Sequence, residues 1–324
     1  MRYLICIFCL SILLFSACEN DFELTEGKVN IPIVYGILSP NDTAHYIRLE
    51  RAFSDPEKPA SAIALIPDSL YYSNADVRLY RTRGNLEVSL DKVDGNLEGF
   101  IRNEGAFAQS PNILYKVNQS KIGIQPGDIV ELRITLDDGK KVSSTTVIVE
   151  PPFPQSPNYS TGSLNFEYTV SNNYSFNPGA NSAVHSVIMH VKILEIFSDG
   201  TSITKVLPWT IAQNTDTRRV QVLGRDFYQF LRSNLDSDPQ IKRFFQSIDF
   251  EIISGTQEIL DYVRVLQANL GITSSGEIPV YSNMSTGFGI FASRASTIIK
   301  NLPLSATTQD SLKRGFITKD LNFQ

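Results

Sequence analysis

Apolar and polar residues alternate along much of the chain with a period of two, which is typical of half-buried β-strands. The clearest case is the run 130–136, where every second residue is Val, Leu or Ile. The same alternation marks 46–50 and 76–80, and the segment 31–38 is rich in β-branched residues. No sustained helical period appears before residue 150, so the first half is predicted to be all β.

Two Asp-Gly pairs stand between strand-like runs in this half, Asp94-Gly95 and Asp138-Gly139. Asp-Gly supplies the positive φ values that a tight hairpin needs. Short strands separated by such turns predict an immunoglobulin-like antiparallel β-sandwich over 28–150.

The second half mixes the two periods. Long β-rich stretches cover 184–197 and 202–211, and Asp199-Gly200 between them predicts another hairpin. Ile248 to Ile253 alternates as a further strand. The part after Tyr281 is predicted to be strand and loop.

Three short helices are predicted within this second half. The first is N-capped by Asp226, and the second starts at Asp238-Pro239 with an apolar stripe formed by Ile241, Phe244, Phe245 and Ile248. The third is capped by Thr256 and ends at Gly271. The fold class is therefore β-rich α+β, with a β-rich domain carrying these helices over 158–324.

A proline-rich segment separates the halves. Four prolines occur within 151–157, and such a run favours an extended spacer over a central strand. We interpret 151–157 as the linker between the two predicted domains.

All three cysteines, Cys6, Cys9 and Cys18, lie in the first 18 residues. Residues 1–17 read as a signal peptide: a basic start, an apolar core and a small-residue cleavage site. The end of this segment, Phe15-Ser16-Ala17-Cys18, resembles a bacterial lipobox, with Phe where Leu is usual. A plain signal peptide is the alternative, but one mature cysteine forms no internal disulfide, and acylation gives Cys18 a role.

The sequence thus predicts an outer-membrane lipoprotein bound to the lipid membrane through acylated Cys18. Residues 18–27 form an acidic tether, which resembles the surface-export signal of Bacteroidetes lipoproteins. A solvated linker is the equal alternative, so the face of the outer membrane stays open.

The composition argues against one class of partner and supports a folded core. The 324 residues include 29 basic and 34 acidic side chains, for a net charge of −5, which argues against nucleic acid as a partner. Hydrophobic residues make up 42% of the chain, enough for a folded core.

The sequence contains no Gly-x-Ser-x-Gly elbow, Walker loop or Gly-x-Gly-x-x-Gly fingerprint. Three histidines are present, and the five-residue separation of His185 and His190 places them on opposite faces of a strand, so no metal site or cofactor is predicted. Ser202-Ile203-Thr204-Lys205 matches the Ser-x-x-Lys motif but lies in a predicted strand, where that chemistry has no helix start. An Asp/Glu pair needs no short motif, so a carbohydrate-active hydrolase remains the alternative to a non-enzymatic protein.

The order of these features resembles a known family. Gly99-Phe100, the run Ile113-Leu114-Tyr115-Lys116-Val117 and Gly127-Asp128-Ile129-Val130-Glu131-Leu132 precede the prolines. The closing segment 279–291 contains Ser282-Asn283, Gly287, Gly289 and Phe291 in the pattern Ser-Asn-x-x-x-Gly-x-Gly-x-Phe. This is similar to the Bacteroidetes lipoprotein family of unknown function DUF4249, although Gly276-Glu277-Ile278-Pro279 departs from the stretch that often precedes this pattern.

The resemblance implies an envelope protein, often encoded near TonB-dependent transporters of the outer membrane, and brings no catalytic residues. The leading hypothesis is a non-enzymatic binding or accessory module that acts with such a transporter or with secretion machinery. The closing segment has two interpretations. Its glycines permit a close backbone approach while its phenylalanines fill the core, or Tyr281, Asn283, Phe288 and Phe291 contact a partner.

Overall fold

One long sheet runs through the whole molecule. The computed structural model describes residues 30–52, 59–158, 162–270 and 280–324; the predicted signal peptide 1–17, Cys18 and the tether 18–27 lie outside these residues. The long sheet has eight strands, in the spatial order β12 (Ser202–Thr215), β11 (Val184–Ile196), β14 (Lys242–Gly255), β15 (Phe288–Leu302), β1 (Ile31–Leu38), β2 (Ala44–Ala52), β6 (Ile113–Asn118) and β5 (Asp91–Asp94).

Two smaller sheets cover parts of the long one. The four-stranded sheet has the order β4 (Leu86–Ser89), β3 (Asp76–Arg81), β7 (Ile129–Thr135) and β8 (Lys141–Val147). The three-stranded sheet has the order β13 (Arg219–Leu223), β10 (Ser171–Asn177) and β9 (Phe153–Ser156). The described residues therefore form 15 strands, most of them paired antiparallel.

Six α-helices complete the described part of the chain. Three short ones belong to the first half: α2 (Ala60–Ala64), α3 (Pro67–Leu70) and α4 (Gln119–Ile122). Three longer ones follow: α5 (Gly224–Asn234), α6 (Gln257–Leu270) and α7 (Ala306–Arg314), with a 3-10 turn at Lys319–Leu321.

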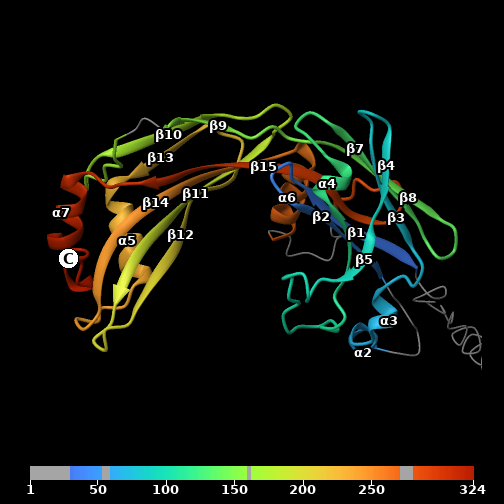
Figure 1. Cartoon of the computed structure of the whole chain (residues 1–324), viewed down its shortest axis with the longest axis horizontal. Coiled ribbons are helices and arrows are strands. Elements are labelled where there is room, and N and C mark those ends of the chain that lie inside the picture. Colours follow the sequence, from blue (N-terminus) through green and yellow to red (C-terminus); the bar gives the residue numbers. More distant parts are fainter. Residues whose placement is uncertain (1–29, 53–58, 159–161, 271–279) are drawn as a thin grey trace, which may run out of the picture.

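Strand β15 joins the two halves of the molecule. Its first part pairs parallel with β1, from Ile33 opposite Phe288 to Leu38 opposite Ser293. Its second part pairs antiparallel with β14, where Gly255 lies opposite Arg294. Figure 1 shows the result as an arch whose crown is crossed by β15. We call the side with β1–β8 the first lobe and the side with β9–β14, α5 and α7 the second lobe.

Each lobe has its own apolar core on one face of the long sheet. In the first lobe, the long sheet contributes Val34, Ile47 and Phe291 to a core shared with Leu79 and Leu132 of the four-stranded sheet. In the second lobe, a separate core gathers residues of β11 and β14 with the three-stranded sheet, α5 and α7 (Met189, Phe250, Tyr174, Phe227 and Leu312 among them). The alternation seen in the sequence thus describes a long sheet buried on one face only.

Most predicted strands are confirmed, including those at 31–38, 130–136 and 184–197. The hairpins at Asp138-Gly139 and Asp199-Gly200 are confirmed as well, with φ of +80° at Gly139 and +84° at Gly200. The β-rich fold class is therefore correct.

Some predictions at Asp-Gly and Asp-Pro pairs were wrong. Asp94-Gly95 ends β5, but the chain returns to pair only at Ile113, so no tight hairpin forms there. The helix predicted after Asp238-Pro239 is strand β14, because Phe244 and Phe245 pair with Leu194 and Ile193 of β11. Helix α5 begins at Gly224, two residues before the predicted cap Asp226.

Helix α6 agrees with the prediction at its start, immediately after Thr256, while its predicted stop at Gly271 lies outside the described residues. The end of the chain departs from the predicted strand and loop, because helix α7 follows β15.

The proline-rich segment 151–157 is more than a spacer. It contains β9 (Phe153–Ser156), an edge strand that pairs with β10. Proline is tolerated on an edge strand because one side of the strand needs no N–H donor. The first part of β15, which belongs to the second half of the sequence, completes the sheet of the first lobe. The division into 28–150 and 158–324 as independent folding units remains a prediction.

Candidate functional site

The face of the long sheet opposite the two cores is polar and partly exposed. Along β1 the exposed side chains are Tyr35 and Ile37, while Val34 and Leu38 point into the core. Along β11 the same face carries His190 and Lys192. Figure 1 shows this face of the sheet lining the inner side of the arch. Because it runs across both lobes, it is an extended candidate binding surface, of which α6 covers a part.

A hollow of about 600 Å³ lies on this face next to the crown. The β1–β2 turn, the start of β2, the loop after β5 and β15 form its walls. The lining residues are Ile37, Asn41, Asp42, Thr43, Ala44, His45, Tyr46, Glu98, Phe100 and Arg294. A smaller hollow of about 80 Å³ shares Asn41, Asp42 and Arg294 with it and extends to Glu251 of β14. Together the two hollows extend from the first lobe to strand β14 of the second lobe.

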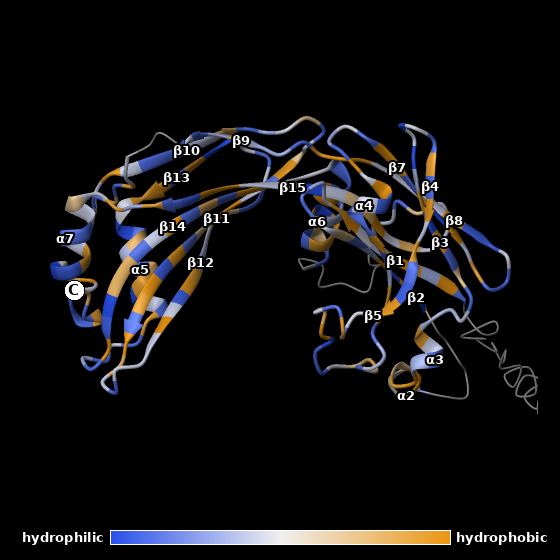
Figure 2. Ribbon diagram, viewed as in Figure 1, coloured by the Kyte–Doolittle hydropathy of each residue, from blue (hydrophilic) through white to orange (hydrophobic). Residues whose placement is uncertain are grey.

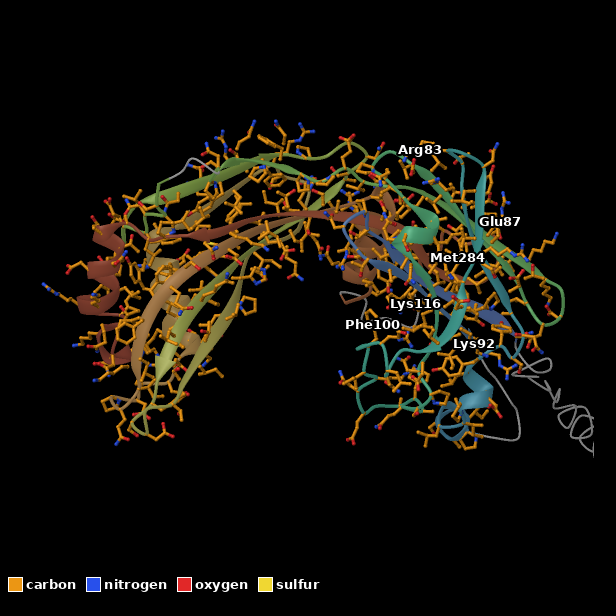
Figure 3. All side chains as sticks on the ribbon, in the orientation of Figure 1. Arg83, Glu87, Lys92, Phe100, Lys116 and Met284 are labelled. Carbon is orange, nitrogen blue, oxygen red and sulfur yellow. The ribbon has the colours of Figure 1, made fainter. Side chains whose placement is uncertain are left out.

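One wall of the larger hollow is a linked polar and aromatic cluster. Glu98 Oε2 accepts hydrogen bonds from Lys116 Nζ at 2.5 Å and from Tyr46 Oη at 3.0 Å. The rings of Tyr46 and Phe100 meet edge to face with centroids 4.7 Å apart. The hydrogen bond from Lys116 lowers the pKa of Glu98, so this carboxylate stays charged. Figure 3 labels Phe100 and Lys116 close to each other on the first lobe.

The opposite wall offers one acid and one base that are not paired. Within the described residues, Asp42 and Arg294 take part in no ion pair, although both line the same two hollows. The position of Asp42 is set by the β1–β2 turn, where its N–H donates to the carbonyl of Ser39 and Asn41 Oδ1 accepts from the N–H of Ser296. Asp42 is therefore held on a hydrogen-bonded turn and Arg294 on strand β15, where it pairs with Gly255.

The adjoining part of the second lobe carries charges that are already paired. His190 Nε2 lies 2.8 Å from Glu251 Oε2, and Lys192 Nζ lies 2.7 Å from Asp249 Oδ2. These pairs join β11 to β14 on the inner side of the arch. As predicted, His185 points to the other face, where it is buried.

The four predicted contact residues lie near one another but differ in exposure. Phe291 is fully buried in the core of the first lobe, so it is not on a surface. Asn283 bonds the backbone of Phe291. Phe288 is exposed, and Tyr281 is partly buried against Tyr262 of α6, with burial raising its pKa to about 12. The core-filling interpretation of this segment therefore accounts for Asn283 and Phe291.

Sequence reasoning missed Asp42, Phe100 and Arg294 as neighbours. They come from segments far apart in the chain, and the order β15-β1-β2-β6-β5 in the long sheet brings them together. One local signal was present: Arg294 is the only charged residue in the otherwise apolar or small stretch 287–299.

The described residues contain no group of three or more His, Cys, Asp or Glu side chains placed to hold a metal ion. None of their helices has both the length and the apolar character needed to cross a bilayer.

Comparison with known proteins identifies a sequence family that matches the chain. No curated protein matches it. Among solved structures, it is similar to one described as "Structural insight into host cell surface retention of a 1.5-MDa bacterial ice-binding adhesin", at 12% identity, over 87% of this chain and 67% of that chain, with a TM-score of 0.16. The family model described as "Domain of unknown function (DUF4249)" matches residues 19–298, which is most of the chain and includes the first lobe and the second lobe up to the last part of β15. The chain therefore belongs to the DUF4249 family.

Proposed function

We propose that this protein is a non-enzymatic lipoprotein of the outer membrane that binds a partner in the hollow under the crown of the arch. The observation that carries the proposal is the pair Asp42 and Arg294, which line one hollow of about 600 Å³ without an ion-pair partner among the described residues. Charges held on a fixed backbone give orientation and specificity to binding. The apolar flank of Ile37 and Phe100 adds area that a partner can bury.

The first lobe is proposed to be an immunoglobulin-like sandwich. Two facing sheets with a shared core support this assignment. Strand β15, which comes from the end of the chain, completes one of the sheets.

The partner proposed is a TonB-dependent transporter of the outer membrane or a component of secretion machinery, and the anchor is acylated Cys18. The anchor is tested by Cys18→Ala, which is expected to abolish fatty-acid labelling and partitioning into the detergent phase. Unchanged membrane association of Cys18→Ala would overturn it.

The binding site is tested by pull-down of the lipidated protein from detergent-solubilised membranes. The double variant Asp42→Asn with Arg294→Gln is expected to recover much less partner than the wild type. The matched control is Asp320→Asn with Lys313→Gln, which makes the same charge changes at exposed positions near the end of the chain. Equal recovery by both double variants would place the binding site elsewhere.

A carbohydrate-active hydrolase is the second candidate, because the carboxylates of Asp42 and Glu251 both line the smaller hollow. Glycosidases use two carboxyl groups that flank the scissile bond. Turnover of a glycan library that disappears in Asp42→Asn would favour this candidate over the binding module.

A further inference from the structure

The end of the first lobe where the described chain begins is built from two neighbouring segments. Ile31 pairs with Ala52, and Asp94 with Ile113, so β1 starts at the same end of the sheet where β2 and β5 finish. Helices α2 and α3 follow β2 at this end, and the connection 95–112 follows β5. The N–H of Ala108 donates to the carbonyl of Ala64 at 2.9 Å, which joins the two segments directly.

These two segments expose large apolar side chains. Their exposed fractions are 61% for Leu65, 43% for Ile66, 88% for Leu97, 75% for Ile101 and 44% for Phe107. We call these five residues the apolar tip; Leu97 and Ile101 flank Glu98 and Phe100 of the hollow and so belong to the inner side of this end. Single exposed apolar residues are normal on a protein surface, but a group of this kind on two joined segments marks an interaction site. Figure 2 shows hydrophobic colouring on α2 at this end of the molecule.

The corresponding end of the second lobe is different. It is formed by the β11–β12 hairpin and by the segment after α5, whose exposed residues include Ser198, Asp199 and Asp236. The described residues of this end also expose Ile203 at 55%, Val206 at 49% and Phe244 at 37%. The end of the first lobe thus exposes more large apolar side chains than the end of the second.

Polar side chains border the apolar tip on the side that faces the long sheet. Arg102 Nη1 donates to Glu50 Oε1 at 2.9 Å and to Tyr71 Oη at 2.8 Å, and its guanidinium lies 5.3 Å from the ring centroid of Phe107. Arg51 bonds the carbonyls of Asp68 and Ser69. An apolar end bordered by arginine and tyrosine side chains matches the change from acyl chains to headgroups at a bilayer surface.

The position of Asn30, the first described residue, indicates which surface lies next to the apolar tip. Asn30 lies at the same end, where its Oδ1 accepts from Tyr72 Oη at 2.8 Å. Asn30 lies twelve positions after Cys18, with eleven residues between them. Fully extended, twelve residues span at most about 40 Å. A lipid on Cys18 therefore holds this end of the first lobe within about 40 Å of the bilayer surface.

We propose that the apolar tip inserts into the lipid surface as a second membrane contact, so that acylated Cys18 and the tip together hold the first lobe against the membrane. This inference rests on the proposed lipid anchor. Burial of the five side chains at the depth of the headgroups is favourable because apolar area leaves water. The first lobe then stands on the membrane, and the inner face of the arch keeps a fixed orientation to it.

The test uses the lipidated protein in vesicles of phosphatidylethanolamine and phosphatidylglycerol. Mature protein has Cys18 as its sole cysteine, so acylation leaves an introduced cysteine as the one free thiol for a nitroxide label. Labels are placed at Leu65→Cys or Ile101→Cys in the tip, with Ser198→Cys as the control in the second lobe. Relative accessibility to oxygen and to a water-soluble nickel complex reports the depth of each label.

Tip labels are expected to favour oxygen over the nickel complex several times more than the label at Ser198. The pair Leu97→Ser and Ile101→Ser, at exposed positions, is expected to return the label at Leu65 to water. Vesicle-bound protein whose tip labels match Ser198 would overturn the tip contact while leaving the anchor intact. Tip labels that are shielded only in native membranes would overturn it in favour of a protein partner. Failure of the wild type to float with vesicles, with free thiol at Cys18, would reject the anchor itself.

Discussion

The side-chain amide of Asn283 hydrogen-bonds both backbone groups of Phe291: its Nδ2 donates to the carbonyl at 2.7 Å, and its Oδ1 accepts from the N–H at 2.9 Å. Phe291 pairs with Gly36 of β1 on the other side. In this half of β15, Asn283 thus takes the place of a neighbouring strand. It satisfies two buried backbone groups at the point where the closing strand enters the first lobe.

Asn283→Ala is expected to lower the free energy of unfolding by about 2–4 kcal/mol, because two buried backbone groups lose their partners. Denaturant unfolding measures the change. Thr286→Ala, at an exposed position of the same loop, serves as the control and is expected to stay near the wild type. Equal stability of Asn283→Ala and the wild type would show that water replaces the amide.

Gly289→Ala is expected to be more damaging. Gly289 has φ of +129°, and a Cβ there would lie 1.8 Å from the carbonyl oxygen of Val34. The pairing of β15 with β1 would have to shift, so we expect loss of more than about 3 kcal/mol or failure to fold. Gly139→Ala is the matched control, since its φ is +80° but nothing lies within 4 Å of the new Cβ.

The control at Gly139 is expected to cost only about 1 kcal/mol, which is the price of positive φ alone. Thermal and denaturant unfolding of both variants checks the difference. Similar losses at the two glycines would contradict a role for close contact between β15 and β1.

The hydrophobic pattern of the sequence made the positions of most strands predictable. Alternation predicted most strands correctly, because each strand has one face on a core and the other toward solvent. The spacing of Ile241, Phe244, Phe245 and Ile248 fits a helix equally well, and pairing with β11 determines that they form a strand instead.

The long-range pairings were not predictable from local pattern. The hydrophobic pattern of residues 288–293 does not indicate that they pair in parallel with a strand more than 250 residues earlier in the chain. This pairing nevertheless creates the arch and its hollow. The Ser-Asn-x-x-x-Gly-x-Gly-x-Phe pattern did mark the place. Its structural interpretation required the contacts of Gly289 with Val34 and of Asn283 with Phe291.

The end of the chain is held by a buried ion pair. Arg243 and Glu195 are 1% and 6% exposed, and Arg243 Nε donates to Glu195 Oε1 at 2.7 Å. Arg243 Nη1 also donates to the carbonyl of Leu321 at 2.8 Å. Arg243→Ala is expected to cost about 3–5 kcal/mol, because it leaves the carboxylate of Glu195 buried without a partner.

Hydrogen exchange gives a second readout, in which residues 319–324 should lose protection in Arg243→Ala. The double variant Arg243→Met with Glu195→Leu is expected to recover part of the lost stability, since both charges are absent. A double variant that is no more stable than Arg243→Ala would mean that the loss of the bond to Leu321, which both variants share, dominates over the unpaired charge.

The stability of the second lobe is expected to depend on pH through His185. Its side chain is 3% exposed, and its Nδ1 lies 2.9 Å from Ser254 Oγ. Burial, with a smaller contribution from the positive charge of Arg218, lowers the pKa of His185 below its ordinary value of about 6.5. The folded protein therefore keeps this imidazole neutral at pH values where the unfolded chain already binds a proton.

Because the unfolded state binds more protons below pH of about 6.5, this contribution to stability is complete above that pH and is lost as the pH falls. His185→Asn keeps a polar side chain near Ser254 but removes the titration. We expect the wild type to lose more stability than His185→Asn between neutral and mildly acidic pH, in parallel urea unfolding series. All other ionisable groups are common to both proteins, so their contributions cancel in the difference. A difference in unfolding free energy that stays constant with pH would show that His185 titrates alike in the folded and unfolded states.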